Sequence, residues 1–192
     1  MWQRLLPTVA FAAPNAPEPC PGSPTGYQWF PISRLEPNAM GSGVKAAAGA
    51  LSNFLDAELE RLNLTGDRLA LVGFSQGTMM SLHVGLRRKI KPAAIVGYSG
   101  MLTEADGLGT LAREAPPIIL IHGSADTMIP AEFLFMSAGA LGQAGAAVQW
   151  HISPGVGHSI DEQGLALGGM FLAMAFRGLL KRIGPEIHCS VP

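Results

Sequence analysis

Apolar and polar positions along the chain form two alternating patterns. Short apolar runs bounded by polar or turn residues predict strands at residues 68–74, 93–99, 117–123 and 147–153. Longer stretches with apolar residues at helical spacing predict helices at residues 43–62, 76–90, 131–143 and 161–183. Because the strand runs are almost continuously apolar, they are typical of strands covered on both faces. The pattern therefore predicts an α/β fold with a mostly parallel sheet and helices on both faces.

The first residues of the chain admit two interpretations. Arg4, an apolar stretch and an Ala-Phe-Ala sequence resemble a signal peptide, but the stretch is short and Pro7 interrupts it. We favour the structural interpretation, in which WQRLLP is the end of a helix and TVAFAAP, residues 8–14, is a buried strand.

Residues 14–37 are rich in proline and glycine and predict a long loop, and loops of this length tend to be functional. Within it, YQWF at 27–30 brings three aromatic residues together. They either line a ligand pocket or pin the loop to the core, and the sequence leaves both interpretations open. Beyond the loop, Ser42 is expected to cap the helix over 43–62.

Composition supports one globular domain over residues 1–192. Hydrophobic residues make up 48% and charged residues 14%, which argues against disorder. The net charge is −1 and no long basic stretch exists, so nucleic acid is not an expected partner. The densest basic run, residues 87–91, falls at an expected helix end, where cations suit the helix dipole. No segment reaches the roughly 20 apolar residues that span a bilayer, and a cytoplasmic location is expected.

Cysteine usage adds little chemistry. Cys20 and Cys189 stand in no metal-ligand spacing, and the histidines and acids show none either, so neither a metal nor a cofactor is expected. Free thiols are favoured, with a bridge between the two cysteines as the alternative.

The sequence GFSQG at residues 73–77 suggests a catalytic serine. A serine on a sharp turn between a strand and a helix is exposed to substrate, and the turn brings neighbouring backbone so close that Gly73 and Gly77 are both expected to be required. The backbone N–H of Gln76 would then face a developing oxyanion. The alternative is a tight turn in which Ser75 is incidental.

Two later residues complete a candidate triad. Asp126 follows the strand at 117–123, although an aspartate in GSADTMIP could equally be a turn residue. His158 follows the strand at 147–153, and the order Ser75, Asp126, His158 is the one that this kind of sheet requires. His158 would act as base and Asp126 would orient its imidazole. The other histidines are expected to be structural or solvated: His83, His122, His151 and His188.

Taken together, the stretches PNAPEPCP, WFPI, GFSQGTMMS, YSG, IHGSADTMIP and GVGHSI resemble the phospholipase/carboxylesterase family of α/β-hydrolases. The resemblance covers nearly the whole chain. It implies that Ser75, Asp126 and His158 are nucleophile, acid and base. It also implies that an acyl pocket is bordered by residues of three loops: Trp29, Phe30, Leu102, Met128 and Ile129.

The chain departs from the family in two places. Pro31 stands where the family usually has an acidic residue. A front segment of the family is also absent: a hairpin, then a central strand that ends in a His-Gly-rich loop carrying the second oxyanion amide. The strand would lie between those at 8–14 and 68–74, so N-terminal truncation is expected. Neighbouring strands could close the gap, or another chain could fill it, which makes a homodimer one expected assembly.

The expected activity is that of a carboxylesterase acting on small or medium acyl esters, small molecules, through an acyl-enzyme. The alternatives are a lysophospholipase or acyl-protein thioesterase, and a catalytically impaired or silent binding domain.

Overall fold

The structure is a computed structural model that describes residues 2–21, 23–32, 37–105 and 107–180. Its helices are α1 (Trp2–Leu5), α2 (Pro37–Leu62), α3 (Gln76–Arg87), α4 (Gly109–Arg113), α5 (Glu132–Gln143) and α6 (Glu162–Phe176), with a 3₁₀ turn at Gly66–Arg68. Its strands are β1 (Glu18–Pro19), β2 (Tyr27–Gln28), β3 (Ala70–Phe74), β4 (Ala94–Tyr98), β5 (Ile118–Gly123) and β6 (Val148–Ser153).

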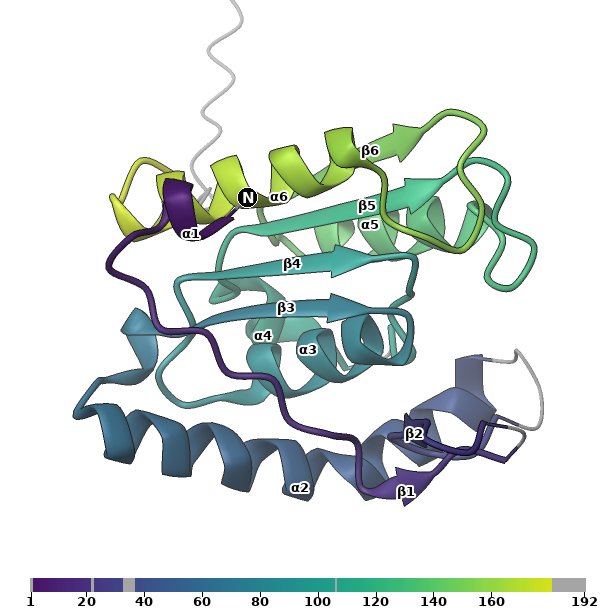
Figure 1. Ribbon diagram of the computed structural model, residues 1–192. Helices are drawn as coiled ribbons and strands as arrows, with labels where there is room; N and C mark the ends of the chain where they lie inside the picture. Colours follow the sequence, from purple (N-terminus) through teal and green to yellow (C-terminus); the bar gives the residue numbers. More distant parts are fainter. Residues whose placement is uncertain (1, 22, 33–36, 106, 181–192) are drawn as a thin grey trace, which may run out of the picture.

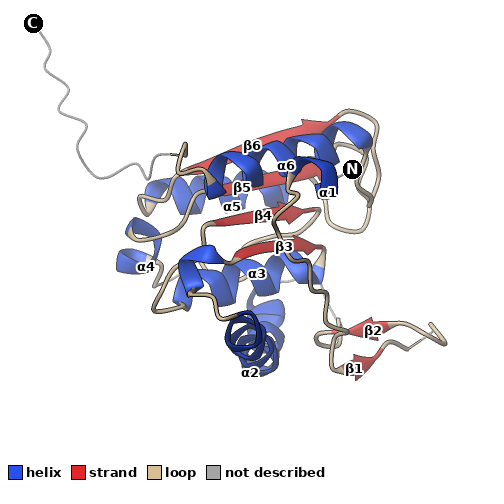
Figure 2. Cartoon of the chain, turned by 60° about the vertical axis from the view of Figure 1, so that its left-hand side comes forward, coloured by secondary structure: helices blue, strands red, loops and turns tan. Residues whose placement is uncertain are grey.

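The main sheet has the order β3-β4-β5-β6, and every neighbouring pair is parallel. All residues of β4 and β5 are buried, as their continuous apolar runs predicted. Helices α3, α4 and α5 lie on one face of the sheet and α1 with α6 lie on the other, while α2 packs on α3 beyond the β3 edge (Figures 1 and 2). The structure therefore confirms the predicted α/β fold with helices on both faces.

Each face has its own hydrophobic core. The larger core joins α2, α3 and α5 to the sheet through residues such as Val44, Met80 and Leu134. The smaller core packs α1 and α6 on β4 and β5, with Tyr98 and Phe171 among its members. Burying such side chains contributes about 1.5–3 kcal/mol each. Because the four strands are parallel, their carboxyl ends meet at one edge of the sheet.

The boundaries of helices α2, α3 and α6 differ from the predicted ones. Helix α2 begins at Pro37, so Ser42 lies inside the helix and is not its cap. Proline suits a first helical position, because its missing N–H would have had no partner there. Helix α3 ends at Arg87, and α6 ends at Phe176. The long loop also contains the small β1–β2 hairpin.

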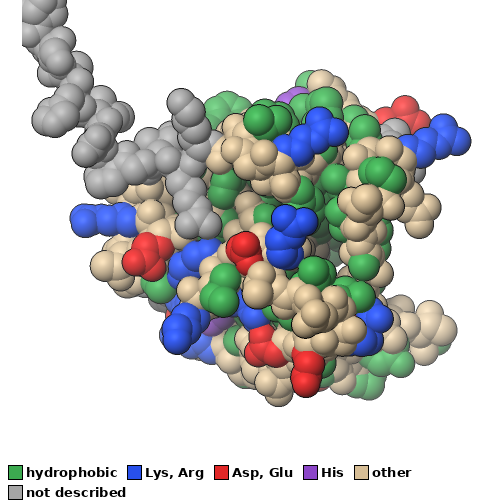
Figure 3. Space-filling view, turned by 90° about the vertical axis from the view of Figure 1, so that its left-hand side faces the viewer, with side chains coloured by type: hydrophobic (Ala, Val, Ile, Leu, Met, Phe, Trp, Pro, Cys, Tyr) green, Lys and Arg blue, Asp and Glu red, His purple; other side chains and the backbone are tan. Residues whose placement is uncertain are grey.

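The basic run at 87–91 closes helix α3, as predicted. Lys91 Nζ donates to the Leu86 carbonyl at 2.7 Å, and Arg88 pairs with Asp56 of α2 at 2.5 Å. On the face at the amino ends of the strands, acidic and basic side chains are interspersed (Figure 3). Within the described ranges, no helix is both long and apolar enough to cross a bilayer.

The predicted strand at residues 8–14 is wrong. This segment runs past β3 toward the β1–β2 hairpin without joining the sheet (Figure 1). A strand needs a hydrogen-bonded neighbour, and among the described residues no strand lies between this segment and β3. Among the described residues, β3 is therefore an edge strand of the sheet. Its residues Val72 and Phe74 are 44% and 39% exposed.

Replacing Val72 with lysine is expected to weaken self-association. An apolar edge strand is a template for pairing with a second chain, and charge at the edge opposes that pairing. We expect the dissociation constant of any dimer to rise about fivefold, which corresponds to about 1 kcal/mol. Sedimentation velocity over a concentration series measures it. Ile90→Lys, which charges an apolar side chain 52% exposed outside the sheet, is the control. Equal effects of both variants would contradict edge pairing.

Candidate active site

Ser75 occupies a strained turn between β3 and α3. Its backbone angles are φ 55° and ψ −119°, a region that residues with a Cβ rarely adopt. The Ser75 N–H donates to the Tyr98 carbonyl at 2.9 Å, and Thr78 Oγ1 lies 2.8 Å from the same oxygen. The serine is thereby fixed to β4 at the carboxyl edge of the sheet, with its residue partly exposed.

The two glycines of the turn are not equivalent. A Cβ at Gly73 would lie 2.2 Å from the carbonyl carbon of Gly77, a distance that backbone cannot accommodate. A Cβ at Gly77 would meet nothing within 4 Å. The prediction that both glycines are sterically required is therefore confirmed for Gly73 and wrong for Gly77, because the space beside Gly77 is open.

This asymmetry predicts opposite results for two alanine substitutions. Gly73→Ala is expected to lower the free energy of unfolding by about 3 kcal/mol, because the turn must open to admit the methyl group. Gly77→Ala, which adds the same group in open space on α3, should change it by less than about 1 kcal/mol. Urea denaturation of both variants measures the difference. Equal destabilisation would show that the turn is packed differently.

Asp126 lies in the turn after β5, with its side chain fully buried. Its Oδ1 accepts the N–H groups of Met128 and Ile129, both at 2.9 Å, and its Oδ2 lies 2.8 Å from His158 Nδ1. The carboxylate thus serves both as a turn residue and as the partner of a histidine. Burial works to raise the pKa of Asp126, but the Ile129 amide and His158 outweigh it and lower that pKa.

His158 is carried by the loop between β6 and α6. A Cβ at Gly123 would lie 2.2 Å from the Val156 carbonyl oxygen, so the glycine at the end of β5 lets this loop approach closely. The imidazole of His158 lies against the Phe74 ring, with a centroid distance of 4.7 Å. His158 therefore sits between Asp126 and the residue that directly precedes Ser75.

His122 is buried beside Asp126, which agrees with the structural one of the two roles that its sequence left open. Its Nε2 lies 2.7 Å from the Ile129 carbonyl and 3.3 Å from Asp126 Oδ2. The ring is buried, so it packs beneath the carboxylate rather than toward solvent. Its position four residues before Asp126, at the end of a strand, was the available signal.

A cavity of about 780 Å³ opens beside the serine. The residues that line it come from the long loop and the strained turn: Pro14, Asn15, Ala16, Cys20, Pro21, Thr25, Tyr27, Gln28, Trp29, Pro31, Ile32, Phe74, Ser75, Gln76 and Gly77. The Gln76 side chain ties these parts together. Its Oε1 accepts the Trp29 N–H and its Nε2 donates to the Phe30 carbonyl, both at 2.8 Å. The Ser75 turn and the aromatic loop are therefore joined by the Gln76 side chain.

The predicted pocket residues lie in different surroundings. Trp29 lines the cavity that holds Ser75, whereas Phe30 is buried in the larger core against Gly43 of α2. The aromatic loop thus has both roles that its sequence left open. Ile129 is buried in the same core, Met128 is 60% exposed, and Leu102 lines a second cavity between α2 and α5.

The start of α3 presents a backbone donor beside Ser75. Gln76 is the first residue of α3, so its N–H has no carbonyl one turn earlier in the helix to bond. The helix dipole adds partial positive charge at this end. Among the described residues, no group of histidine, cysteine, aspartate and glutamate is arranged to hold a metal ion. Cys20 is a free thiol, and both Cys189 and His188 lie outside the described residues.

A parallel sheet with helices on both faces, a serine on a strained strand–helix turn, and an Asp–His pair after later strands define the class of α/β-hydrolases. The chain order of the three residues is the order that this class uses.

Comparison with known proteins gives the family. The model of the Phospholipase/Carboxylesterase family matches residues 1–175. An acyl-protein thioesterase 1 from Gibberella zeae is 32% identical over 175 residues, which cover 82% of this chain and 74% of that protein. The crystal structure of esterase PE8 superposes with a TM-score of 0.82 at 36% identity, over 93% of this chain and 82% of the other. The chain belongs to the phospholipase/carboxylesterase family. Its relatives in this family support a hydrolase that acts on esters.

Proposed function

We propose that the protein is a serine hydrolase that cleaves carboxylic esters of small to medium acyl chains through an acyl-enzyme. The observation that carries the proposal is the 2.8 Å contact between His158 Nδ1 and Asp126 Oδ2, with the same imidazole against Phe74 beside Ser75. Because Nδ1 faces the carboxylate, Nε2 is the nitrogen left to exchange a proton with the serine and the leaving group.

The reaction follows from these roles. Ser75 Oγ attacks the acyl carbon while His158 Nε2 takes its proton, and Asp126 stabilises the resulting imidazolium. The negative charge on the substrate oxygen faces the Gln76 N–H. Nε2 then protonates the leaving alkoxide, which departs as the alcohol. In the second half, Nε2 activates a water that releases the acid and restores Ser75.

The oxyanion site is the weak point of this mechanism. The family resemblance implies a second oxyanion amide on a His-Gly-rich loop, in addition to the Gln76 N–H. The loss of one such donor costs about 2.7–4 kcal/mol of transition-state stabilisation. The silent binding domain therefore stays as a second candidate, which an activity assay separates from the esterase.

The substrate class has one close alternative. Acyl-protein thioesterase and lysophospholipase activities use the same triad, and the Gibberella zeae relative carries the thioesterase name. We propose small-molecule acyl esters as substrates because the cavity beside Ser75, of about 780 Å³, has the size of a small-molecule pocket. We also propose a cytoplasmic location, which the free thiol of Cys20 fits, and a homodimer in which the β3 edge takes part.

A rate series over p-nitrophenyl esters from acetate to palmitate tests the proposal. We expect the highest kcat/KM at short or medium chain length, and hydrolysis of the matched thioesters at no higher rate. Preference for palmitoyl thioesters would favour the thioesterase alternative. No hydrolysis by a folded protein, together with no labelling by a fluorophosphonate probe, would favour the silent domain.

A further inference from the structure

Glu104 lies in the connection between β4 and α4 and contacts three basic side chains from two helices. Lys45 of α2 pairs with its Oε1, and Arg87 Nη2 of α3 lies 3.2 Å from its Oε2. His83 Nδ1, also on α3, lies 3.4 Å from Oε2. The Glu104 side chain is 18% exposed and that of His83 only 8%. One carboxylate thus joins α2, α3 and the connection.

The charge on Glu104 is favoured by these neighbours. Burial works to raise its pKa, but Lys45, Arg87 and His83 together outweigh burial, so the pKa of Glu104 is lowered. Burial, followed by the nearby Arg87, lowers the pKa of His83. The carboxylate is therefore ionised at neutral pH, and Lys45 and Arg87 supply the opposing charge.

The same connection is held from its other sides. The Leu102 N–H donates to Ser137 Oγ of α5 at 2.8 Å, and that hydroxyl donates to the Phe133 carbonyl at 2.6 Å. A Cβ at Gly41 of α2 would lie 3.2 Å from Glu104 Cγ, so α2 approaches the connection closely. Residues 100–105 are consequently clamped between α2, α3 and α5.

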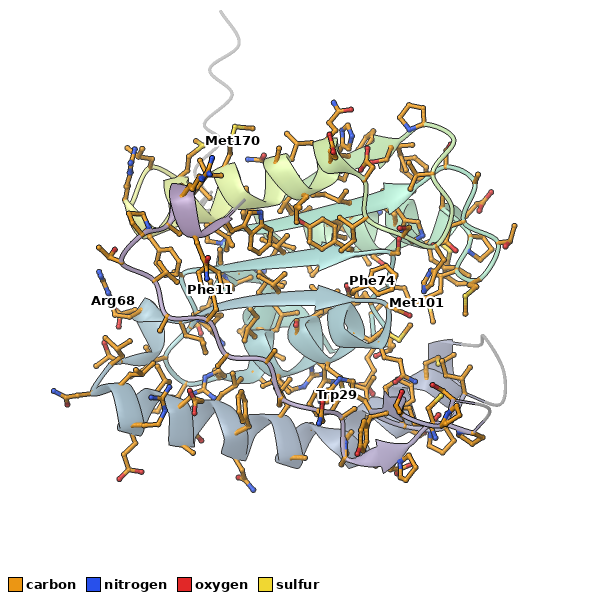
Figure 4. All side chains as sticks on the ribbon, viewed as in Figure 1. Phe11, Trp29, Arg68, Phe74, Met101 and Met170 are labelled. Atoms are coloured by element: carbon orange, nitrogen blue, oxygen red, sulfur yellow. The ribbon has the colours of Figure 1, made fainter. Side chains whose placement is uncertain are left out.

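This segment begins at the nucleophile. A Cβ at Gly100 would lie 2.7 Å from the Ser75 carbonyl oxygen, so the segment starts in contact with the strained turn. Met101 is buried at the end of the sheet where Phe74 also lies (Figure 4). Leu102 and Glu104 then line the second cavity, of about 780 Å³, with Lys45 and Phe133. Residues 100–105 therefore run from contact with the Ser75 turn to the second cavity, where residues 102–105 form part of its wall.

We propose that Glu104 is a positioning residue that fixes the wall formed by residues 102–105 and thereby sets how well longer acyl chains bind. The inference rests on the proposed function, because the wall matters to an acyl chain only if Ser75 accepts one. Glu104 does not act on the reacting atoms. Its loss should loosen the wall while leaving the hydroxyl of Ser75 and the Asp126–His158 pair in place.

Glu104→Gln tests the proposal with little change in shape. Amide hydrogen exchange should become severalfold faster in residues 100–105. KM for p-nitrophenyl octanoate should rise about tenfold while KM for the acetate and both kcat values stay within about twofold. Lys45→Gln, which leaves Arg87 in contact, should give a smaller change in the same direction. The matched control is Glu58→Gln, which breaks an ion pair with Arg61 elsewhere on α2 and should change neither readout.

The outcomes separate the two hypotheses. Unchanged exchange in residues 100–105 would overturn the role of Glu104 whether or not the protein is active. Faster amide exchange with an unchanged ratio of KM for the octanoate to KM for the acetate would show that Glu104 has only a structural role. Wild-type protein that hydrolyses no ester and takes up no fluorophosphonate would overturn the proposed function, and with it the effect on acyl chains.

Discussion

Ser75→Ala is expected to lower kcat for p-nitrophenyl acetate by about 10⁴-fold or more, because no other group can then form the acyl-enzyme. The variant removes the hydroxyl that we propose as the nucleophile and leaves the backbone of the strained turn unchanged. Alanine also has a Cβ, so the φ of 55° costs no more than it does with serine. The thermal midpoint should therefore be preserved, which makes the loss of rate attributable to chemistry.

Ser159→Ala is the matched control. Ser159 is exposed and directly follows His158, but the proposed mechanism gives its hydroxyl no role. Its variant should keep kcat within about twofold. If Ser75→Ala retained wild-type kcat in a preparation free of contaminating esterase, the serine would be an incidental turn residue and the mechanism would be wrong.

Asp126→Asn is expected to lower kcat by about 10⁴-fold through the tautomer of His158. Asparagine keeps an oxygen for the N–H groups of Met128 and Ile129, so the turn should survive. Its NH₂ group, however, would face His158 Nδ1, which would then have to accept a hydrogen bond instead of donating one. The proton would shift to Nε2, the atom that must act as base. Steady-state kinetics with a short ester measures the loss.

The rate of labelling by a fluorophosphonate probe checks this explanation. If the imidazole is in the wrong tautomer, acylation of Ser75 should slow, and the variant should show slow labelling by a fluorophosphonate that still reaches completion. Rapid labelling at the wild-type rate would contradict a role for Asp126 in orienting His158.

The same substitution has a signature in stability. The pKa of Asp126 is lowered from its ordinary value of 3.8, so ionisation of this group favours the folded state. That contribution is present above the unfolded pKa and is lost as pH falls through the folded pKa. The stability advantage of the wild type over Asp126→Asn should therefore shrink as pH falls below about 4. An advantage that grew at acidic pH would contradict the direction of the shift.

The sequence contained enough to place Ser75, Asp126 and His158 at the carboxyl edge of the sheet, but not to place every strand. Ser75, Asp126 and His158 each follow an apolar run, and parallel strands bring their carboxyl ends to one edge whatever the loops do. Asp126 was assignable both to a turn and to a triad, and its two oxygens serve one role each. A single oxygen could not have satisfied both interpretations.

Features that depend on distant partners were the ones missed. Residues 8–14 have strand composition, but strand formation depends on a neighbour that local pattern cannot supply. Gly77 lacks its expected close contact because the adjacent space is open, and the sequence around it carries no sign of this. His122 was predicted to be structural or solvated, and the local pattern did not show that the turn after β5 brings it beside Asp126.

Mass-spectrometric mapping of a fluorophosphonate adduct tests the central claim most directly. The wild-type protein should carry one adduct, on the tryptic peptide of residues 69–87, with fragment ions that place it on Ser75. His158→Ala should label far more slowly at the same position. An adduct on another residue, or an unmodified peptide from a protein shown to be folded, would contradict the assignment of Ser75 as the nucleophile.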